Sequence, residues 1–141
     1  MYWQLQVCTA FNMIQCRVKG AVSMKIVIGG QMGKEEIKEL AVTAMGDEGE
    51  VVIKDDVAAA MEVKDGKADL YLGACMTGGG GALAMAIAIL GYGTCMTVAD
   101  ADEAAIRKAL ESGKKAFGFT PSMSKTVVPV IVRLAKEVMC N

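Results

Sequence analysis

Residues 69–86 have the sequence DLYLGACMTGGGGALAMA, and this stretch decides the predicted fold. The apolar run that ends at Ala74 predicts a buried strand, and the apolar run after the glycines predicts a helix. Between them lie one thiol, Cys75, one hydroxyl, Thr77, and four consecutive glycines at 78–81. Because glycine has no side chain, the backbone N–H groups of this turn can face a ligand directly. They also lie where a helix begins, and a helix N-terminus attracts anions. The stretch therefore predicts a site for a phosphate or a carboxylate.

The amino-acid composition excludes several classes of function. The chain has 141 residues, a formal net charge of −1 and 53% apolar residues, which suit one domain with a sizeable core. No basic run is interleaved with aromatic side chains, so we expect no binding to nucleic acid. Histidine is absent, which excludes Ser–His and Cys–His catalytic pairs, and we expect no metal site and no cofactor. The five cysteines contain no CxxC pair, which favours reduced thiols in a cytoplasmic protein.

Residues 1–23 differ from the rest of the chain. They hold Tyr2, Trp3 and Phe11 and no acidic residue, and their charges follow the apolar part, the reverse of a secretory signal. Polar residues interrupt the segment too often for a membrane span. We interpret 1–23 as an N-terminal extension and 24–141 as a single α/β domain. The alternative is an extra strand or a docking segment that covers apolar surface.

From Met24 onward, strand-like apolar runs alternate with helical runs. Strands are expected at 25–28, 50–54, 68–74, 94–98 and 115–119, with helices between and after them. This alternation predicts a doubly wound, three-layer α/β sandwich with a five-stranded parallel sheet of Rossmann-like type. The expected strand order is 2-1-3-4-5, with a switch point between strands one and three. Ligands bind at the carboxyl ends of the strands at such a point, so we expect the loop 29–33 beside the loop 73–81.

The helix expected at 81–90 is apolar on every face. It is too short to span a bilayer, and we expect no membrane association. A helix without a polar face is buried on two sides. We therefore expect a second copy of the chain to cover its outer side, which makes the protein a homo-oligomer.

Two known nucleotide motifs are approached but not completed. Residues 29–34, Gly-Gly-Gln-Met-Gly-Lys, are one residue short of the phosphate-loop spacing, and Glu35 replaces the hydroxyl that would hold magnesium. Leu83 falls on the last glycine that the dinucleotide pattern requires. Nucleoside triphosphates and dinucleotides are therefore poor candidates for the ligand.

Cys75 is the candidate for chemistry. It follows a buried strand and precedes a helix N-terminus, a position that lowers the pKa of a thiol. A thiolate there could take a proton from a carbon next to a carbonyl, and nearby N–H groups would stabilise the enediolate. Thr77 could donate a hydrogen bond to a substrate oxygen. The alternative is a small buried cysteine that fills space.

Several polar residues outside this stretch are also candidates. Asp100 follows strand four and could face the cleft, although helix capping by Asp100 or Asp102 explains one of the two. Likewise, Asp55 or Asp56 caps the helix after strand two. Four residues of the last helix and its start are candidates for holding an anion: Ser122, Ser124, Lys125 and Arg133. The expected ligand-binding residues are Gly29, Gly30, Gln31, Gly78, Gly79, Gly80, Gly81 and Asp100, with Cys75 and Thr77 as the catalytic pair.

Short features across 24–138 occur together in one known family. They are the Met-Lys-Ile start, Asp-x-Tyr-x-Gly-Ala-Cys-x-Thr-Gly at 69–78, Ile-Leu-Gly-Tyr at 89–92 and Ala-Phe-Gly at 116–118. With these features the sequence resembles the YhfU-like family of uncharacterised bacterial proteins. Membership implies no established activity.

More distantly, the chain resembles the type B pentose-phosphate and galactose-phosphate isomerases. Residues 24–29 match their Met-Lys-Ile-x-Ile-Gly start, and 66–69 with 75–80 match their Gly-x-Ala-Asp and Cys-Gly-Thr-Gly-x-Gly elements. The resemblance implies that Cys75 is the base at carbon two, that Thr77 assists ring opening and that the amides of the glycines at 78 and 80 hold the enediolate. The histidines and arginines with which that family opens and grips the sugar phosphate have no counterparts, and Met76 replaces a glycine.

Together these patterns predict binding of a small anionic metabolite of sugar-phosphate type, with an isomerase-like proton transfer by Cys75. The alternative is a non-catalytic binding or regulatory subunit that acts with other sugar-phosphate enzymes.

Overall fold

The computed structural model describes residues 24–76 and 80–139. Along the chain its strands and helices are β2 (Met24–Gly30), α2 (Lys34–Met45), β3 (Gly49–Ile53), α3 (Asp56–Lys64), β4 (Leu70–Ala74), α4 (Gly80–Leu90), β5 (Cys95–Thr97), α5 (Glu103–Glu111), β6 (Ala116–Phe119) and α6 (Ser124–Met139). Two short 3-10 turns, η1 (Tyr92–Thr94) and η2 (Pro121–Met123), precede β5 and α6. The alternation expected from the sequence is therefore confirmed, with small shifts at the ends of the elements.

The strands form one five-stranded parallel sheet in the order β3-β2-β4-β6-β5. Counted along the chain this order is 2-1-3-5-4, so the expected order 2-1-3-4-5 is wrong in its last two positions. The burial of the last two strands explains the difference. All of β6 is buried and needs a neighbour on each side, whereas β5 has a half-buried Met96 and an exposed Thr97, which suit the edge of the sheet.

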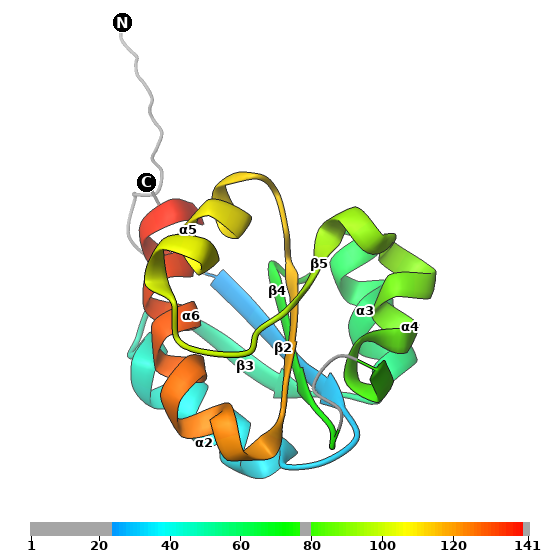
Figure 1. Ribbon diagram of the computed structural model, residues 1–141, viewed down its shortest axis with the longest axis horizontal. Coiled ribbons are helices and arrows are strands. Elements are labelled where there is room, and N and C mark those ends of the chain that lie inside the picture. The colour runs from blue at the N-terminus through cyan, green and yellow to red at the C-terminus, as the bar shows by residue number, and fades with distance from the viewer. Residues whose placement is uncertain (1–23, 77–79, 140–141) are drawn as a thin grey trace, which may run out of the picture.

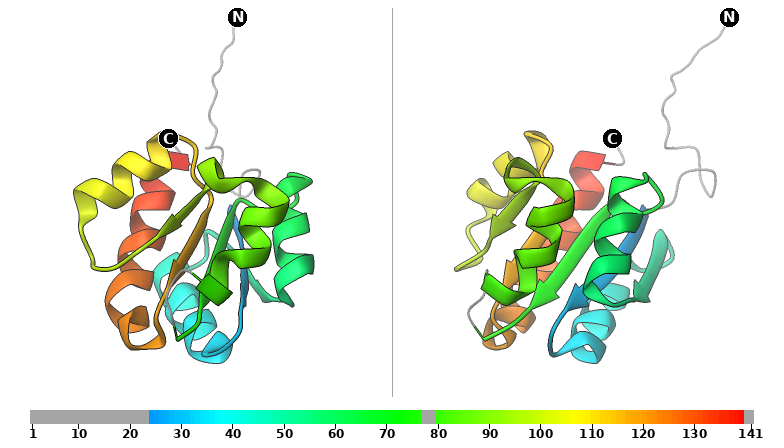
Figure 2. Two further views of the ribbon diagram at one scale, coloured as in Figure 1. Left: turned by 45° about the vertical axis from the view of Figure 1, so that its right-hand side comes forward. Right: turned by 90° about the vertical axis from the view of Figure 1, so that its right-hand side faces the viewer.

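Helices cover both faces of the sheet and complete the predicted three-layer sandwich. Helices α2, α5 and α6 lie on one face, and α3 and α4 lie on the other (Figure 1). Turned to face the viewer, α3 and α4 lie side by side in front of the sheet (Figure 2, right). Among the described residues, no helix is both long enough and apolar enough to cross a membrane.

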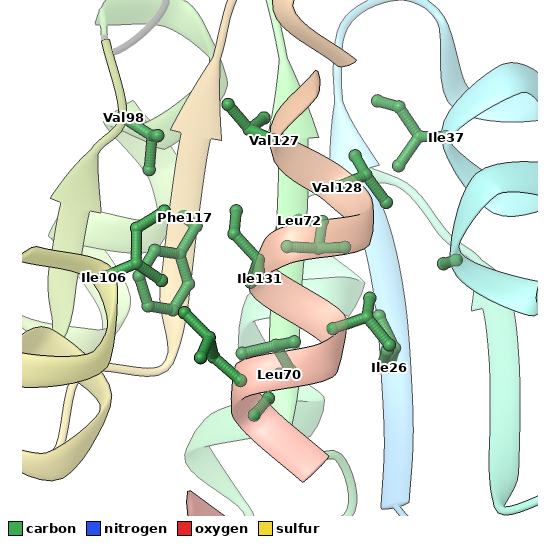
Figure 3. Close-up of a cluster of buried hydrophobic side chains, with 14 of the residues drawn as sticks. Ile26, Ile37, Leu70, Leu72, Val98, Ile106, Phe117, Val127, Val128 and Ile131 are labelled. Atoms are coloured by element: carbon green, nitrogen blue, oxygen red, sulfur yellow. The ribbon is translucent and has the colours of Figure 1, made fainter. Parts of the chain in front are cut away.

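The two faces of the sheet carry different cores. Under α2, α5 and α6, large aliphatic and aromatic side chains of the sheet meet those of the helices (Figure 3): Ile26, Leu70, Leu72 and Phe117 with Ile37, Ile106, Val127, Val128 and Ile131. Under α3 and α4 the helical residues are mostly small, and the largest sheet residue is Tyr71. Small helical side chains let α3 and α4 lie close to the sheet. The Tyr71 ring fills the space between the sheet and these helices.

Aspartates fix three local features of the fold. Asp55 accepts the Ala58 N–H at 2.8 Å and caps α3, and Asp102 accepts the Ala105 N–H at 3.1 Å and caps α5. Asp69 accepts the Lys25 N–H at 2.9 Å through its carboxylate and donates its own N–H to the Lys25 carbonyl at 2.8 Å. Asp69, although part of the family motif, therefore holds the register of β2 and β4 at the end of the sheet remote from the candidate site.

Candidate functional site

Three loops meet at the carboxyl edge of the sheet, on the lower side of Figure 1. The N–H groups of Gln31 and Met32 donate to the Ala74 carbonyl oxygen at 3.0 and 3.4 Å, and the Cys75 N–H donates to the Phe119 carbonyl at 3.2 Å. The turn after β2 is therefore bonded to the end of β4, as predicted, and the segment after β6 joins them. Helices α2, α4 and α6 begin at this edge, so their amino-terminal ends face it.

Glycines of β2 and β4 make room at this edge for the buried ring of Tyr71. A Cβ on Gly29 would lie 2.6 Å from Tyr71 Cε2, and a Cβ on Gly73 would lie 3.2 Å from Cε1. Gly30 has φ +81°, and a Cβ there would lie 2.6 Å from the Ala74 nitrogen. Gly29 and Gly30 were predicted as ligand-binding residues. The close approach of Tyr71 and Ala74 requires glycine at both positions, whether or not they also bind a ligand.

The Tyr71 hydroxyl ends at this edge and accepts the Gly30 N–H at 3.1 Å. Burial raises the pKa of Tyr71 far above its ordinary value, and the negative charge of Asp56 raises it further, while the Gly30 hydrogen bond opposes the shift. The hydroxyl therefore stays protonated at physiological pH.

Cys75 lies at the end of β4 and is only 3% exposed. Tyr71, four residues earlier in β4, belongs to the core under α3 and α4. Cys95, 5% exposed, belongs to the core under the same helices, and its Sγ lies 3.5 Å from the Gly91 carbonyl. Burial raises the pKa of Cys95, against the opposing charge of Lys114. Cys95 is therefore a core residue, as predicted.

The other predicted site residues are placed as follows. Gln31 is exposed beside the end of β4, and the glycines at 80 and 81 are the first two residues of α4. Asp100 lies in an exposed position after the edge strand β5, and β6 separates that strand from β4. Its predicted role in ligand binding stays a prediction. Three predicted residues lie outside the described residues: Thr77, Gly78 and Gly79.

The polar candidates at the start of α6 divide into two groups. Ser122 pairs with the Thr120 hydroxyl at 3.1 Å, Lys125 Nζ lies 3.8 Å from Glu36, and Arg133 binds Glu103 at 2.7 Å. These groups already have partners at the surface. Ser124 is different, because it is completely buried and its Oγ has no hydrogen-bond partner among the described residues.

Some buried side-chain oxygens have no hydrogen-bond partner in the described part of the chain. Within the described residues such side-chain atoms are Asp56 Oδ1, Glu62 Oε1 and Ser124 Oγ. Glu62 Oε1 nevertheless lies 3.0 Å from Lys25 Nζ in an ion pair. The remaining two belong to the first residues of α3 and α6, which both start at the carboxyl edge. Buried polar groups are normally bonded, so each oxygen calls for a water or ligand partner. The two lie in helices on opposite faces of the sheet, so they belong to two separate places.

Sequence reasoning did not single out Asp56 and Tyr71, whose polar atoms lie near the carboxyl ends of β3 and β2. It treated Asp56 only as an alternative cap for α3. The signal for a second role is the pair Asp55-Asp56. A helix needs only one capping aspartate, so the other aspartate needs a separate explanation. For Tyr71 the signal is a lone aromatic residue in a buried strand that pairs with glycines. No group of three or more His, Cys, Asp or Glu side chains is placed to hold a metal ion in the part of the chain that the structure describes.

A parallel sheet covered on both faces, with loops meeting at its carboxyl edge, defines a Rossmann-like α/β protein. Residues 24–135 match the family described as "Protein of unknown function DUF2620". The chain is 38% identical over 116 residues to "Uncharacterized protein YhfU" of Escherichia coli K12, covering 79% of this chain and 98% of the relative. A protein of the same name from Shigella flexneri gives the same values.

The chain therefore belongs to this family, and the YhfU-like resemblance is confirmed. No solved structure gives a significant match to the chain. The more distant isomerase resemblance stays a prediction.

Proposed function

We propose that this protein binds a small anionic metabolite of sugar-phosphate type at the carboxyl edge formed by the loops after β2, β4 and β6. The observation that supports it most directly is the convergence of these loops, held by the hydrogen bonds to Ala74 and Phe119. The amino-terminal ends of three helices face the same edge and favour negative charge there. Ser124 adds a buried hydroxyl that has no partner among the described residues.

The proposed chemistry is a proton transfer between adjacent carbons with Cys75 as base. The thiolate takes the proton from the carbon next to the carbonyl, and the electron pair moves onto the carbonyl oxygen as an enediolate. Return of that proton to carbon one, with transfer of the hydroxyl proton from the oxygen on carbon two to the oxygen on carbon one, converts an aldose to a ketose without any other reactant. Backbone N–H groups at the start of α4 would stabilise the enediolate charge.

A non-catalytic binding or regulatory role is the second candidate, and one observation favours it. The two arginines among the described residues, Arg107 and Arg133, are both engaged with glutamates of α5 and α6. Neither is therefore available to grip a phosphate in the way that a sugar-phosphate isomerase would need. Uptake of one deuterium from heavy water by a candidate sugar phosphate would establish turnover and exclude this second role.

The first experiment is a thermal-shift series on the full chain with sugar phosphates, inorganic phosphate and small hydroxy acids. A ligand at a hundredfold excess over its dissociation constant adds about 2.7 kcal/mol, which raises the melting temperature by several degrees. Cys75→Ser is expected to keep the shift and to abolish deuterium uptake, because serine fills the space but is a far weaker base. Cys95→Ser, a change at a core thiol of similar burial, is the matched control and should keep both. The absence of a shift with every anion would contradict the proposal.

We also infer that the protein self-associates through α4. Ala84, Met85 and Ala88 are exposed on this helix, beside Val57 and Met61 of α3. Exposed apolar side chains on two adjacent helices are typical of protein interfaces.

A further inference from the structure

A groove of about 350 Å³ lies between α2 and α6. Its apolar wall is formed by Leu40 and Ala44 of α2 and by Pro129 of α6. All three side chains are only half-buried, so the two helices leave apolar surface open to water where they meet. Covering such surface is favourable, which makes the groove a place where another segment of chain can dock.

The polar groups of the groove favour a cationic occupant. Glu36 and Glu39 of α2 line it together with Lys125 of α6. Glu36 Oε2 lies 3.8 Å from Lys125 Nζ, whereas Glu39 has no ion pair with any of the described residues. Pro129 lies inside α6 and has no N–H, so the Lys125 carbonyl lacks the donor that normally lies four residues further along a helix. Acceptors and negative charge therefore outweigh positive charge in the groove.

Contacts between side chains and backbone connect the start of β2 to one end of this groove. The Met24 N–H donates to the Glu48 carbonyl at 3.2 Å. Lys136 Nζ lies 2.7 Å from the carboxylate of Glu48 and donates to the carbonyl of Ala44 at 3.3 Å. Since Ala44 lines the groove, the chain that precedes Met24 joins the domain close to the groove.

Residues 1–23 carry the charge and the apolar side chains that would suit this groove. Arg17 and Lys19 are their only charged side chains, and most of the others are apolar. The chain from Lys19 to Met24 can extend over about 17 Å. The stretch of α2 that lines the groove is about 12 Å long. Both cations are therefore within reach of the glutamates of the groove.

We propose that residues 1–23 dock in the groove between α2 and α6 of the same chain. Their apolar side chains cover the apolar wall of the groove, and Arg17 and Lys19 lie beside its two glutamates. Docking within one chain costs no translational freedom, so a groove of modest size is sufficient. This inference is independent of the proposed function, because the loops of the proposed anion site do not line the groove.

Disulfide trapping in the full chain tests the docking, because the segment contains Cys16. Thr43→Cys places a thiol in the lining of the groove. Val42→Cys is the matched control, since the neighbouring position is 46% exposed but lies outside that lining. Both variants also carry Cys8→Ser and Cys140→Ser, so that no other cysteine near the chain ends competes.

Docking raises the effective concentration of the Cys16 thiol in the groove. Under mild oxidation by glutathione disulfide, the link from Cys16 to position 43 should form at least about fivefold faster than the link to position 42. Each rate is divided by the rate at which the same introduced thiol reacts with an external disulfide, which corrects for differences in thiol reactivity. Peptide mapping by mass spectrometry identifies the linked positions, and a non-reducing gel separates links within one chain from links between two.

A second pair of variants tests the role of charge in the same assay. Arg17→Gln combined with Lys19→Gln should lower the preference for position 43 below about twofold, because the groove then loses its cationic partners. Gln4→Glu combined with Gln6→Glu changes the net charge of the segment by the same amount at a different place. This control should retain the preference.

Each alternative outcome contradicts a defined part of the proposal. Equal corrected rates at positions 42 and 43 would overturn the groove as the docking site. Links formed only between two chains would overturn docking within one chain and assign the groove to the segment of a second copy. A preference that survives the loss of both Arg17 and Lys19 would overturn their pairing with the glutamates.

Discussion

At the scale of single residues, the carboxyl edge depends on the close approach of β2 and β4 around one aromatic ring. Gly29 pairs with Gly73 and Gly30 with Ala74, and Tyr71 occupies the space that side chains at the glycines would take. Because the ring is completely buried, it cannot move aside into solvent. The glycines therefore determine where the Tyr71 hydroxyl lies, and with it the inner wall of the candidate site.

Substitution of Gly29 by alanine is expected to destabilise the protein by about 1–3 kcal/mol, because the new methyl group overlaps a buried ring. Urea unfolding of the variant and the wild type at neutral pH measures this difference. Gly93→Ala is the control, since a Cβ on Gly93 would meet nothing within 4 Å, and its effect should stay within about 0.5 kcal/mol. Equal stability of Gly29→Ala and the wild type would show that β2 and β4 can separate without loss.

At the scale of elements, ion pairs tie α3 to the strands beneath it. Glu62 of α3 lies 3.0 Å from Lys25 Nζ of β2 and 3.1 Å from Lys54 Nζ, just after β3. The Lys34 side chain of α2 donates to the Lys54 backbone carbonyl at 3.0 Å. Helix α2 is thereby also linked to the residue that follows β3. The position of α3, and therefore of Asp56, depends in part on these contacts.

The Glu62 contacts predict a pH dependence of stability. Hydrogen bonds from Lys25 and Lys54 lower the pKa of Glu62 below its ordinary value of 4.5. A lowered pKa in the folded state contributes stability above the unfolded value, and this contribution is lost as the pH falls through the folded value.

Glu62→Gln should therefore reduce the free energy of unfolding at pH 7 by roughly 0.5–1 kcal/mol. The difference from wild type should shrink as the pH falls below about 4. Urea titrations at pH 7 and pH 3.5 measure it, with Glu39→Gln on the exposed side of α2 as control. A difference that is the same at both pH values would argue that the lost contacts are not electrostatic.

At the scale of the whole molecule, the two helical layers differ in the surface that they present. The layer of α2, α5 and α6 carries ion pairs on its outer side, such as Arg133 with Glu103. Helix α4 has no polar side chain, and in the opposite layer it lies beside α3 (Figure 2). This asymmetry is the basis for assigning self-association to the α3–α4 layer.

Light scattering coupled to gel filtration should give the full chain a mass that is a multiple of the monomer mass. Met85→Glu places a charge at a position 39% exposed on α4 and should shift the mass to that of the monomer. Val42→Glu, at a position 46% exposed on α2 in the other layer, should leave the oligomer intact. A wild-type chain that is monomeric at all concentrations would contradict the assignment.

Local pattern was sufficient for much of this fold. Apolar periodicity, glycines and capping residues act over a few residues, so they predicted the strands, the helices, the parallel sheet and the meeting of the loops after β2 and β4. The glycine-rich stretch 78–81 also indicated which edge of the sheet to expect as the site. The choice between Asp55 and Asp56 as cap, by contrast, required the structure, because both positions satisfy the same local rule.

The succession of strands and helices and the class of fold could be predicted from the sequence alone, because the hydrogen bonding and periodicity within each element are local. That β6 lies between β4 and β5 became clear only from the contacts between distant segments. The same contacts place the Tyr71 ring against Gly29 and bury the Ser124 side chain at the start of α6. These features depend on which elements are neighbours across the sheet, and burial between distant segments is not encoded in any short stretch of the chain.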